Sequence, residues 1–107
     1  MNEAPCALCG PLSTPTLRET RFWRTTFNRN QNLLGKLMIV LRRHEAAVAR
    51  LSSEEWAELQ TEVRWATNRL RIAFAPDHYN YAFLQNVDRH VHLHVIPGTL
   101  PLARPPA

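Results

Sequence analysis

Three of the five histidines of this chain stand at alternate positions in one short stretch, HVHLHVIP, residues 90–97. Alternate residues of a β-strand point to the same face of a sheet, so the stretch predicts a strand with His90, His92 and His94 in a row. The residues between them are apolar and would face a core on the other side: Val91, Leu93 and Val95. The outer two histidines of such a row are roughly 13 Å apart. One metal ion could not be bound by all three, and we therefore expect them to have different roles.

The remaining pattern predicts one small α+β domain. The chain has 107 residues, of which 45% are hydrophobic and 21% charged, which is typical of a single globular domain. Residues 17–27 mix β-branched, aromatic and polar types and predict one edge strand, followed by a turn at NRNQN. A second, buried strand is expected around Leu37–Leu41. Residues 79–86 and 90–97 predict two more strands, joined by the short turn VDR in an antiparallel hairpin. The order strand, strand, helix, strand, strand indicates an α+β fold with an antiparallel sheet.

A long amphipathic helix is expected between the two pairs of strands. Ser52 and Glu55 form the S-x-x-E pattern of a capping box, and apolar residues follow at spacings of three and four: Trp56, Leu59, Val63, Ala66, Leu70 and Phe74. This pattern predicts a helix from about Ser53 to Phe74, which Pro76 would end. The first tryptophan falls on the apolar stripe and is expected in the core. Trp65 lies off the stripe and is a candidate for a dimer interface.

Two cysteines near the N-terminus add a candidate metal site. Cys6 and Cys9 form a CxxC motif, whose spacing suits zinc when two further ligands converge on it. A redox pair is the alternative, but the Gly-Pro that follows the motif does not predict the helix of a thioredoxin-like context. His44 ends the second predicted strand, and a histidine of the triad could be the fourth ligand. Two cysteines and two histidines fill all four positions of tetrahedral zinc, so such a site would be structural.

Charge and apolar runs limit the kinds of partner. The formal net charge of +4 favours anionic ligands such as nucleotides, although the arginines are spread along the chain rather than forming a tract. The first ten residues do not read as a secretory signal, and the longest apolar run, LMIVL, is too short to span a bilayer. We therefore expect a cytoplasmic protein that needs neither membrane nor disulfide, with nucleic acid not among its partners.

These motifs together resemble a known family. HVHLHVIP is similar to the HxHxHxx signature of the histidine triad (HIT) family of nucleotide hydrolases and transferases. The other features agree in family order: the CxxC, Gly35 before a buried strand, RRH closing that strand at His44, the helix, and an asparagine-ended strand before the triad. The resemblance covers nearly the whole chain. It implies a HIT-like fold over residues 1–107, with a zinc-binding segment at about 1–15 and a proline-rich tail at 97–107.

The resemblance also implies roles for individual residues. The resemblance is to zinc-containing bacterial members of the family that are similar to dinucleoside polyphosphate hydrolases. Family members are usually homodimers whose sheets join across the interface. In such members a structural zinc would be held by Cys6, Cys9, His44 and His90. The middle histidine, His92, would be the catalytic nucleophile, and His94 would assist it by contacting the phosphates. The residues implied in nucleotide binding, besides that histidine, are Asn28, Gln85 and Asn86. Asn28 could instead serve only as a turn residue.

The chemistry of imidazole is consistent with these roles. A neutral imidazole can attack an α-phosphorus and form a nucleotidyl-histidine, which water or another acceptor then resolves. We expect one ring nitrogen of His92 to donate to a backbone carbonyl and so leave the other free to attack. The substrate would be a nucleoside phosphoramidate or a dinucleoside polyphosphate, the latter with Mg²⁺ as an additional ion. No catalytic metal would be needed among the protein ligands.

The sequence also departs from the family pattern in two places. Only VDR separates Asn86 from His90, where many members carry a loop with glycine and serine or threonine that supplies phosphate donors. Gly98 follows Pro97 where members usually have an arginine. Two other functions therefore stay open: a non-enzymatic, zinc-stabilised module that binds nucleotide or nucleic acid, and a redox or hydrolytic metal centre at the triad itself. The effect of replacing His92 separates the first of these from the enzyme.

Overall fold

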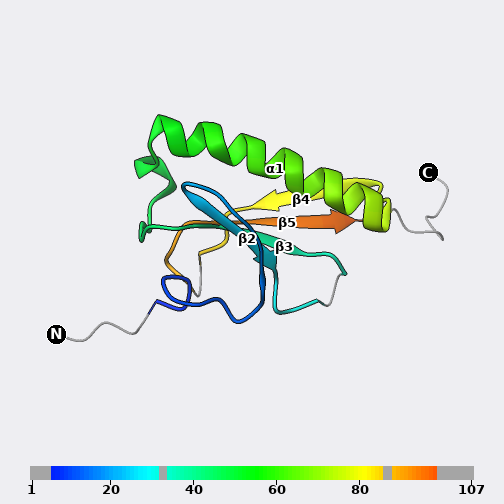
Figure 1. Ribbon diagram of the computed structural model, residues 1–107, viewed down its shortest axis with the longest axis horizontal. Helices are drawn as coiled ribbons and strands as arrows, with labels where there is room; N and C mark the ends of the chain where they lie inside the picture. Colours follow the sequence, from blue (N-terminus) through cyan, green and yellow to red (C-terminus); the bar gives the residue numbers. More distant parts are fainter. Residues whose placement is uncertain (1–5, 32–33, 86–87, 99–107) are drawn as a thin grey trace, which may run out of the picture.

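One antiparallel sheet and one long helix form the molecule, as the sequence predicts. The computed structural model describes residues 6–31, 34–85 and 88–98 (Figure 1). Its five strands are β1 (Thr16–Glu19), β2 (Trp23–Phe27), β3 (Leu37–Leu41), β4 (His78–Ala82) and β5 (His92–Gly98). They lie in the order β1-β2-β3-β5-β4, and every neighbouring pair is antiparallel. The fold class is α+β.

Helix α1 (Ser53–Phe74) has the predicted bounds and the predicted start. The Ser52 side chain accepts a hydrogen bond from the Glu55 backbone N–H, and the Glu55 carboxylate accepts one from the Ser52 N–H, which completes the capping box. A one-turn helix, η1 (Val48–Arg50), precedes it, and Ala75 ends it in the left-handed conformation just before Pro76. Within the described residues, no helix is both long and apolar enough to cross a membrane.

The core lies between α1 and one face of the sheet (Figure 1). β5 contributes apolar side chains to it at alternate positions, including Leu93 and Val95, and Val91 just before the strand joins them. His92 and His94 therefore project from the opposite face of the sheet. The N-terminal segment runs along that side of the sheet (Figure 1). The alternation that separates apolar from histidine side chains is confirmed.

The prediction of one strand over residues 17–27 is wrong. The chain reverses direction at Thr20–Phe22, so the segment forms two antiparallel strands, β1 and β2. The reversal contains no glycine, proline or asparagine. It is stabilised from a distance: the Glu58 carboxylate on α1 accepts hydrogen bonds from the Thr20 hydroxyl and the Phe22 N–H, both at 2.7 Å. No local turn signal announces this hairpin because its partner is 36–38 residues away in the sequence.

The hairpin of β4 and β5 is antiparallel as expected, but its connection is longer than the predicted VDR turn. β4 ends at Ala82, and β5 begins only at His92. His90 consequently stands just before the strand rather than in it, so the triad is not one regular row. The N–H of Val91 donates to the carbonyl of Glu45, which draws this residue toward the loop after β3. Asn86 and Val87 lie outside the described residues.

The expectation that Trp56 lies in the core is wrong. Trp56 is 43% exposed and has its ring edge against Phe83. Trp65 packs against the core, with the guanidinium groups of Arg18 and Arg69 over its ring. The apolar stripe alone could not show this, because the contact of Trp56 with Phe83 depends on the path of the chain after β4.

Candidate active site and metal centre

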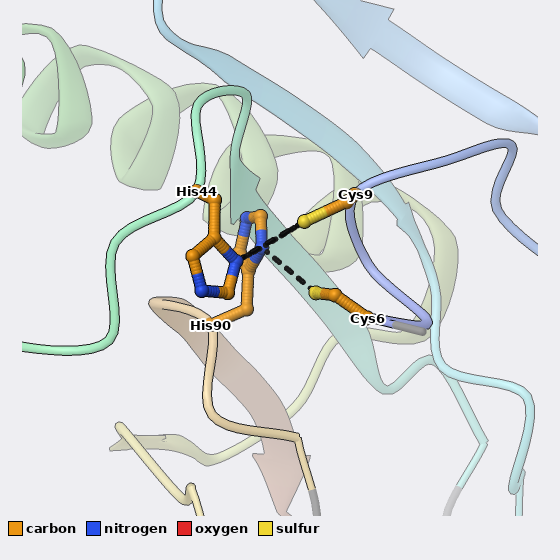
Figure 2. Close-up of side chains that lie close together, drawn as sticks. All are labelled: Cys6, Cys9, His44 and His90. Atoms are coloured by element: carbon orange, nitrogen blue, oxygen red, sulfur yellow. Dashed lines mark hydrogen bonds between the residues drawn. The ribbon is translucent and has the colours of Figure 1, made fainter. Parts of the chain in front are cut away.

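Four side chains from three separate segments converge beside the N-terminal end of β5. Cys6 and Cys9 come from the N-terminal turn, His44 from the loop after β3, and His90 from the residues just before β5 (Figure 2). Their ligand atoms, Sγ of each cysteine and Nδ1 of each histidine, all lie within 4.8 Å of one another. This is the set implied by the family resemblance, and the structure brings all four together.

The spacing of these atoms fits a tetrahedral metal such as zinc. Nδ1 of His90 lies 3.3 Å from Nδ1 of His44 and 3.3 Å from Sγ of Cys6, and Sγ of Cys9 lies 3.1 Å from Nδ1 of His44. Bonds of about 2.0–2.3 Å from zinc to nitrogen and sulfur correspond to tetrahedron edges of about 3.3–3.8 Å. Two thiols and two imidazoles are also the donor set that zinc prefers. The residues present therefore fit the ion.

The surroundings fix the ligand orientation of His90. Its Nε2 lies 2.6 Å from the carbonyl oxygen of Leu41 in β3, so the Nε2–H donates there and Nδ1 keeps the free lone pair that faces the other ligands. Burial lowers the pKa of His90, which favours the neutral form that a metal ligand must have. Val91 is bound to the end of β3 and to the loop after it, because its carbonyl accepts from the Leu41 N–H and its N–H donates to the Glu45 carbonyl.

The surroundings of Cys9 favour the neutral form of its thiol. Among the protein groups alone, desolvation and the neighbouring Cys6 thiol raise the pKa of the Cys9 thiol to about 11. A bound divalent cation reverses such a shift by stabilising the thiolate.

His92 stands in the geometry expected of a nucleophile. Its Nδ1 lies 2.6 Å from the carbonyl oxygen of His90, so the Nδ1–H donates to that oxygen. The proton position leaves the lone pair on Nε2, as predicted from the sequence. His92 is only 3% exposed. Its ring lies edge-on to that of His94, and the two ring centroids are 4.8 Å apart. The backbone of a candidate metal ligand thus orients the candidate nucleophile.

Asn28 reaches the triad as well as stabilising a turn. Its side-chain oxygen accepts the Asn30 N–H at 2.8 Å, which turns its amide nitrogen toward Nδ1 of His94 at 3.3 Å. When Nδ1 of His94 accepts this bond, the proton of the neutral ring stands on Nε2 as a donor. Burial, and next the nearby His92, lower the pKa of His94 and favour that neutral form. The two sequence interpretations of Asn28 are therefore compatible.

A cavity of about 620 Å³ lies over the histidine face. This volume is within the usual range for small-molecule sites. His92, His94 and Asn28 line it, together with apolar side chains such as Leu8, Met38 and Leu84. Three of the candidate residues from the sequence therefore line one cavity: Asn28, His92 and His94.

The other candidates do not share this position. Gln85 is not among the described residues that line the cavity, and its amide donates instead to the carbonyl of Ala46 at 2.6 Å. Asn86 lies outside the described residues. Asp88, which the sequence analysis did not single out, lines the cavity beside His92. It forms no hydrogen bond or ion pair with any part of the chain that the structure describes. Its position in the shortened loop before the triad is the one signal that could have indicated it.

The fold of the chain is that of histidine triad proteins. It superposes on a HIT family protein from Bacillus anthracis with a TM-score of 0.74 and 18% sequence identity, over 82% of this chain and 66% of that one. A member of the HIT family from Bacillus subtilis gives a TM-score of 0.78 and 18% identity, over 89% and 74% of the two chains.

A third similar structure is described as a hypothetical histidine triad nucleotide-binding protein from Sulfolobus tokodaii, with a TM-score of 0.73, 18% identity and coverage of 82% and 62%. The chain thus spans a little under two thirds of the length of the Bacillus anthracis and Sulfolobus tokodaii proteins. No protein-family profile matches the sequence, and no curated protein sequence does so either.

Proposed function

We propose that this chain is a histidine triad enzyme that hydrolyses or transfers nucleotides through a nucleotidyl-histidine at His92. The observation that carries the proposal is the hydrogen bond from Nδ1 of His92 to the His90 carbonyl, which leaves the free lone pair on Nε2 of a residue that lines the cavity. A neutral imidazole held in this tautomer is a nucleophile without further activation. The substrate would be a nucleoside phosphoramidate or a dinucleoside polyphosphate, cleaved at the α-phosphate.

The reaction would proceed in two displacements. In the first, the Nε2 lone pair of His92 forms a bond to the α-phosphorus while the bond to the leaving group breaks, and the leaving group takes that electron pair and a proton from solvent. The positive charge on the ring would be stabilised by the His90 carbonyl that accepts its Nδ1–H. In the second, water bonds to the phosphorus and releases a proton to solvent, while the P–N bond breaks and its electron pair returns to Nε2. The nucleoside monophosphate then leaves a neutral His92.

His94 would stabilise the charge on the transferred phosphoryl group. Its bond to the Asn28 amide fixes the ring and leaves Nε2–H as a donor. A preorganised donor of this kind can lower the barrier by stabilising charge as it develops on the phosphoryl oxygens. With a polyphosphate substrate, Mg²⁺ would neutralise the phosphates that leave. Asn28 and Asn86 remain proposed contacts to the nucleotide, and so does Gln85 if its bond to Ala46 is exchanged on binding.

Cys6, Cys9, His44 and His90 would hold a structural zinc. An ion in this closed set of four ligands would stabilise the fold and supply no open position for substrate. It would also hold His90, whose carbonyl orients the nucleophile.

The remaining proposals concern assembly and location. We propose a homodimer formed through the edge strand β4 and the start of α1, where Trp56 and Tyr81 are exposed and, with Phe83 and Val63, line an apolar groove. Joining two sheets along β4 would also satisfy its free edge. A single domain over residues 1–107 and a cytoplasmic location complete the proposal.

The deciding experiment is mass spectrometry of the intact protein after brief mixing with adenosine 5′-phosphoramidate or diadenosine tetraphosphate. We expect an adenylyl adduct on the wild type and none on His92→Ala, whose zinc content and melting temperature should be unchanged. His78→Ala is the matched control, because His78 is an exposed histidine on β4 outside the cavity. An adduct on His92→Ala would refute the assignment of the nucleophile. Nucleotide binding without adduct or product in the wild type would favour the non-enzymatic module.

A further inference from the structure

The turn that carries the two cysteines also forms part of the cavity wall. Ala7 and Leu8, between the cysteines, line the same cavity as His92 and His94. Leu8 is buried, whereas Cys9 beside it is exposed. This turn therefore contributes to two sites at once, because Cys9 belongs to the candidate metal cluster and Leu8 lines the cavity.

One arginine from the sheet forms hydrogen bonds to the backbone of this turn. Nη2 of Arg24 donates to the carbonyl of Leu8 at 2.8 Å and to that of Gly10 at 3.2 Å. These two carbonyls stand on either side of Cys9. A turn next to a CxxC motif has few partners of its own for its carbonyl groups, and the only backbone bond that the described residues form within it runs from Cys9 N–H to Cys6. The guanidinium group therefore supplies contacts that the turn itself lacks.

Arg24 is held in a fixed place relative to the triad. In β2 it pairs with Val40 of β3, and Val40 pairs in turn with His92 of β5, so the three residues form one straight line across the sheet. Its side chain is half-buried, and its Nε is enclosed without a hydrogen-bond partner in the described ranges. Enclosing a charged group in this way is costly unless it performs a specific contact. The contact that it makes is the pair of carbonyls around Cys9.

We propose that Arg24 is a positioning residue that couples the metal centre to the nucleotide cavity. By fixing the carbonyls of Leu8 and Gly10, it places Cys9 for metal binding and Leu8 as a wall of the cavity. Metal binding and nucleotide binding then order the same turn, and each should strengthen the other by the same factor. The coupling rests on the proposed function in one respect only, namely that the ligand of the cavity is a nucleotide.

The first test is a titration with Co²⁺, whose visible absorption reports tetrahedral sulfur and nitrogen ligands, followed by competition with Zn²⁺ and a chromophoric chelator. Arg24→Met retains the length of the side chain but cannot donate, and we expect it to weaken metal binding by roughly 10- to 100-fold. Arg24→Lys keeps the charge but cannot reproduce the planar fork, so we expect a smaller loss. A metal dissociation constant within twofold of the wild type for Arg24→Met would overturn the proposal.

Arg42→Met is the matched control. Nη1 of Arg42 also donates to two backbone carbonyls, those of Thr20 and Arg21, but in the turn between β1 and β2. It should lower the melting temperature without changing the metal dissociation constant. An equal loss of metal affinity in both variants would mean that Arg24 acts through general stability, and this result would also overturn the proposal.

The second test is calorimetry with adenosine monophosphate. For the wild type we expect the nucleotide to bind more tightly with Zn²⁺ than after chelation, and Zn²⁺ to bind more tightly with nucleotide by the same factor. In Arg24→Met this coupling should decrease at least threefold. Coupling that is absent in the wild type, or unchanged in the variant, would refute the link between the sites. If the wild type binds no nucleotide at all, the proposed function fails and so does the coupling, whereas the Co²⁺ titration still decides whether Arg24 positions the metal ligands.

Discussion

The ion pair between Arg43 and Glu55 should make the stability of this protein depend on pH in a way that one conservative substitution removes. Nε and Nη2 of Arg43 lie 2.8 and 2.9 Å from the two carboxylate oxygens of Glu55. The Glu55 side chain is 3% exposed and that of Arg43 46%. Glu55→Gln keeps the capping box, because glutamine can also accept from the Ser52 N–H, but it removes the charge that faces Arg43.

The magnitude follows from the pKa of Glu55. Hydrogen bonding to Arg43, more than any other contact, lowers this pKa from 4.5 to about 2. A folded-state pKa below the unfolded value means that the stabilisation is present above about pH 4.5 and is lost as the pH falls toward 2. A difference of about 2.5 units corresponds to at most about 3.4 kcal/mol. Because half of the Arg43 side chain faces water, which screens the pair, we expect the pair to contribute about 1–2 kcal/mol at pH 6 and less than half of that at pH 3.

Urea unfolding at pH 6 and pH 3 measures this loss. The metal ligands protonate in acid in every variant, so the relevant quantity is the difference between wild type and Glu55→Gln at the two pH values. The variant should be less stable by about 1–2 kcal/mol at pH 6 and by less than half of that at pH 3, where the carboxylate of the folded protein is still mostly ionised. Glu54→Gln is the control, because the pair of Glu54 with Arg21 is exposed and 3.4 Å long, and should be worth under about 0.5 kcal/mol. Parallel pH profiles for wild type and Glu55→Gln would refute the reasoning.

Three further predictions follow from single contacts. Glu58→Ala should lower the free energy of unfolding in urea by about 1–3 kcal/mol, because it leaves the Thr20 and Phe22 donors without their carboxylate; a change under 0.5 kcal/mol would mean that the hairpin does not depend on α1. Asp88→Asn should tighten adenosine diphosphate binding about 2- to 10-fold in calorimetry, since it removes a negative charge from the cavity; an unchanged dissociation constant would place Asp88 away from the phosphates. Tyr81→Arg should give a monomer in sedimentation velocity, because it puts a charge on the exposed face of β4; a persistent dimer would place the interface elsewhere.

The features that were predictable from the sequence are those with local or periodic signals. The helix was predicted from Ser53 to Phe74 because its capping box, its apolar spacing and Pro76 are all near one another in the chain. The CxxC spacing and His44 predicted a cluster with one histidine of the triad, and only the family resemblance implied that this histidine is His90. The opposite faces of β5 followed from the alternation alone.

The features that were missed depend on contacts between distant parts of the chain. The turn at Thr20 is stabilised by Glu58, and the cysteine turn by Arg24, and neither partner is close in sequence. The irregular position of His90 arises from the bond between Val91 and Glu45, which a strand pattern cannot show. Asp88 lines the cavity, and its place there depends on the path of the chain through space rather than on a motif.

The four-residue cluster also joins the two ends of the described chain. Cys6 and His90 are 84 positions apart in the sequence, yet Sγ of one lies 3.3 Å from Nδ1 of the other. A link that closes a loop of this length removes about 4–5 kcal/mol of conformational entropy from the unfolded chain, as a disulfide would. Because His90 is made late in synthesis, a nascent chain can offer an ion only the cysteines and His44 until most of the sheet exists. A metal bound by all four would therefore lock a fold that has already formed, and slow its unfolding more than it speeds its folding.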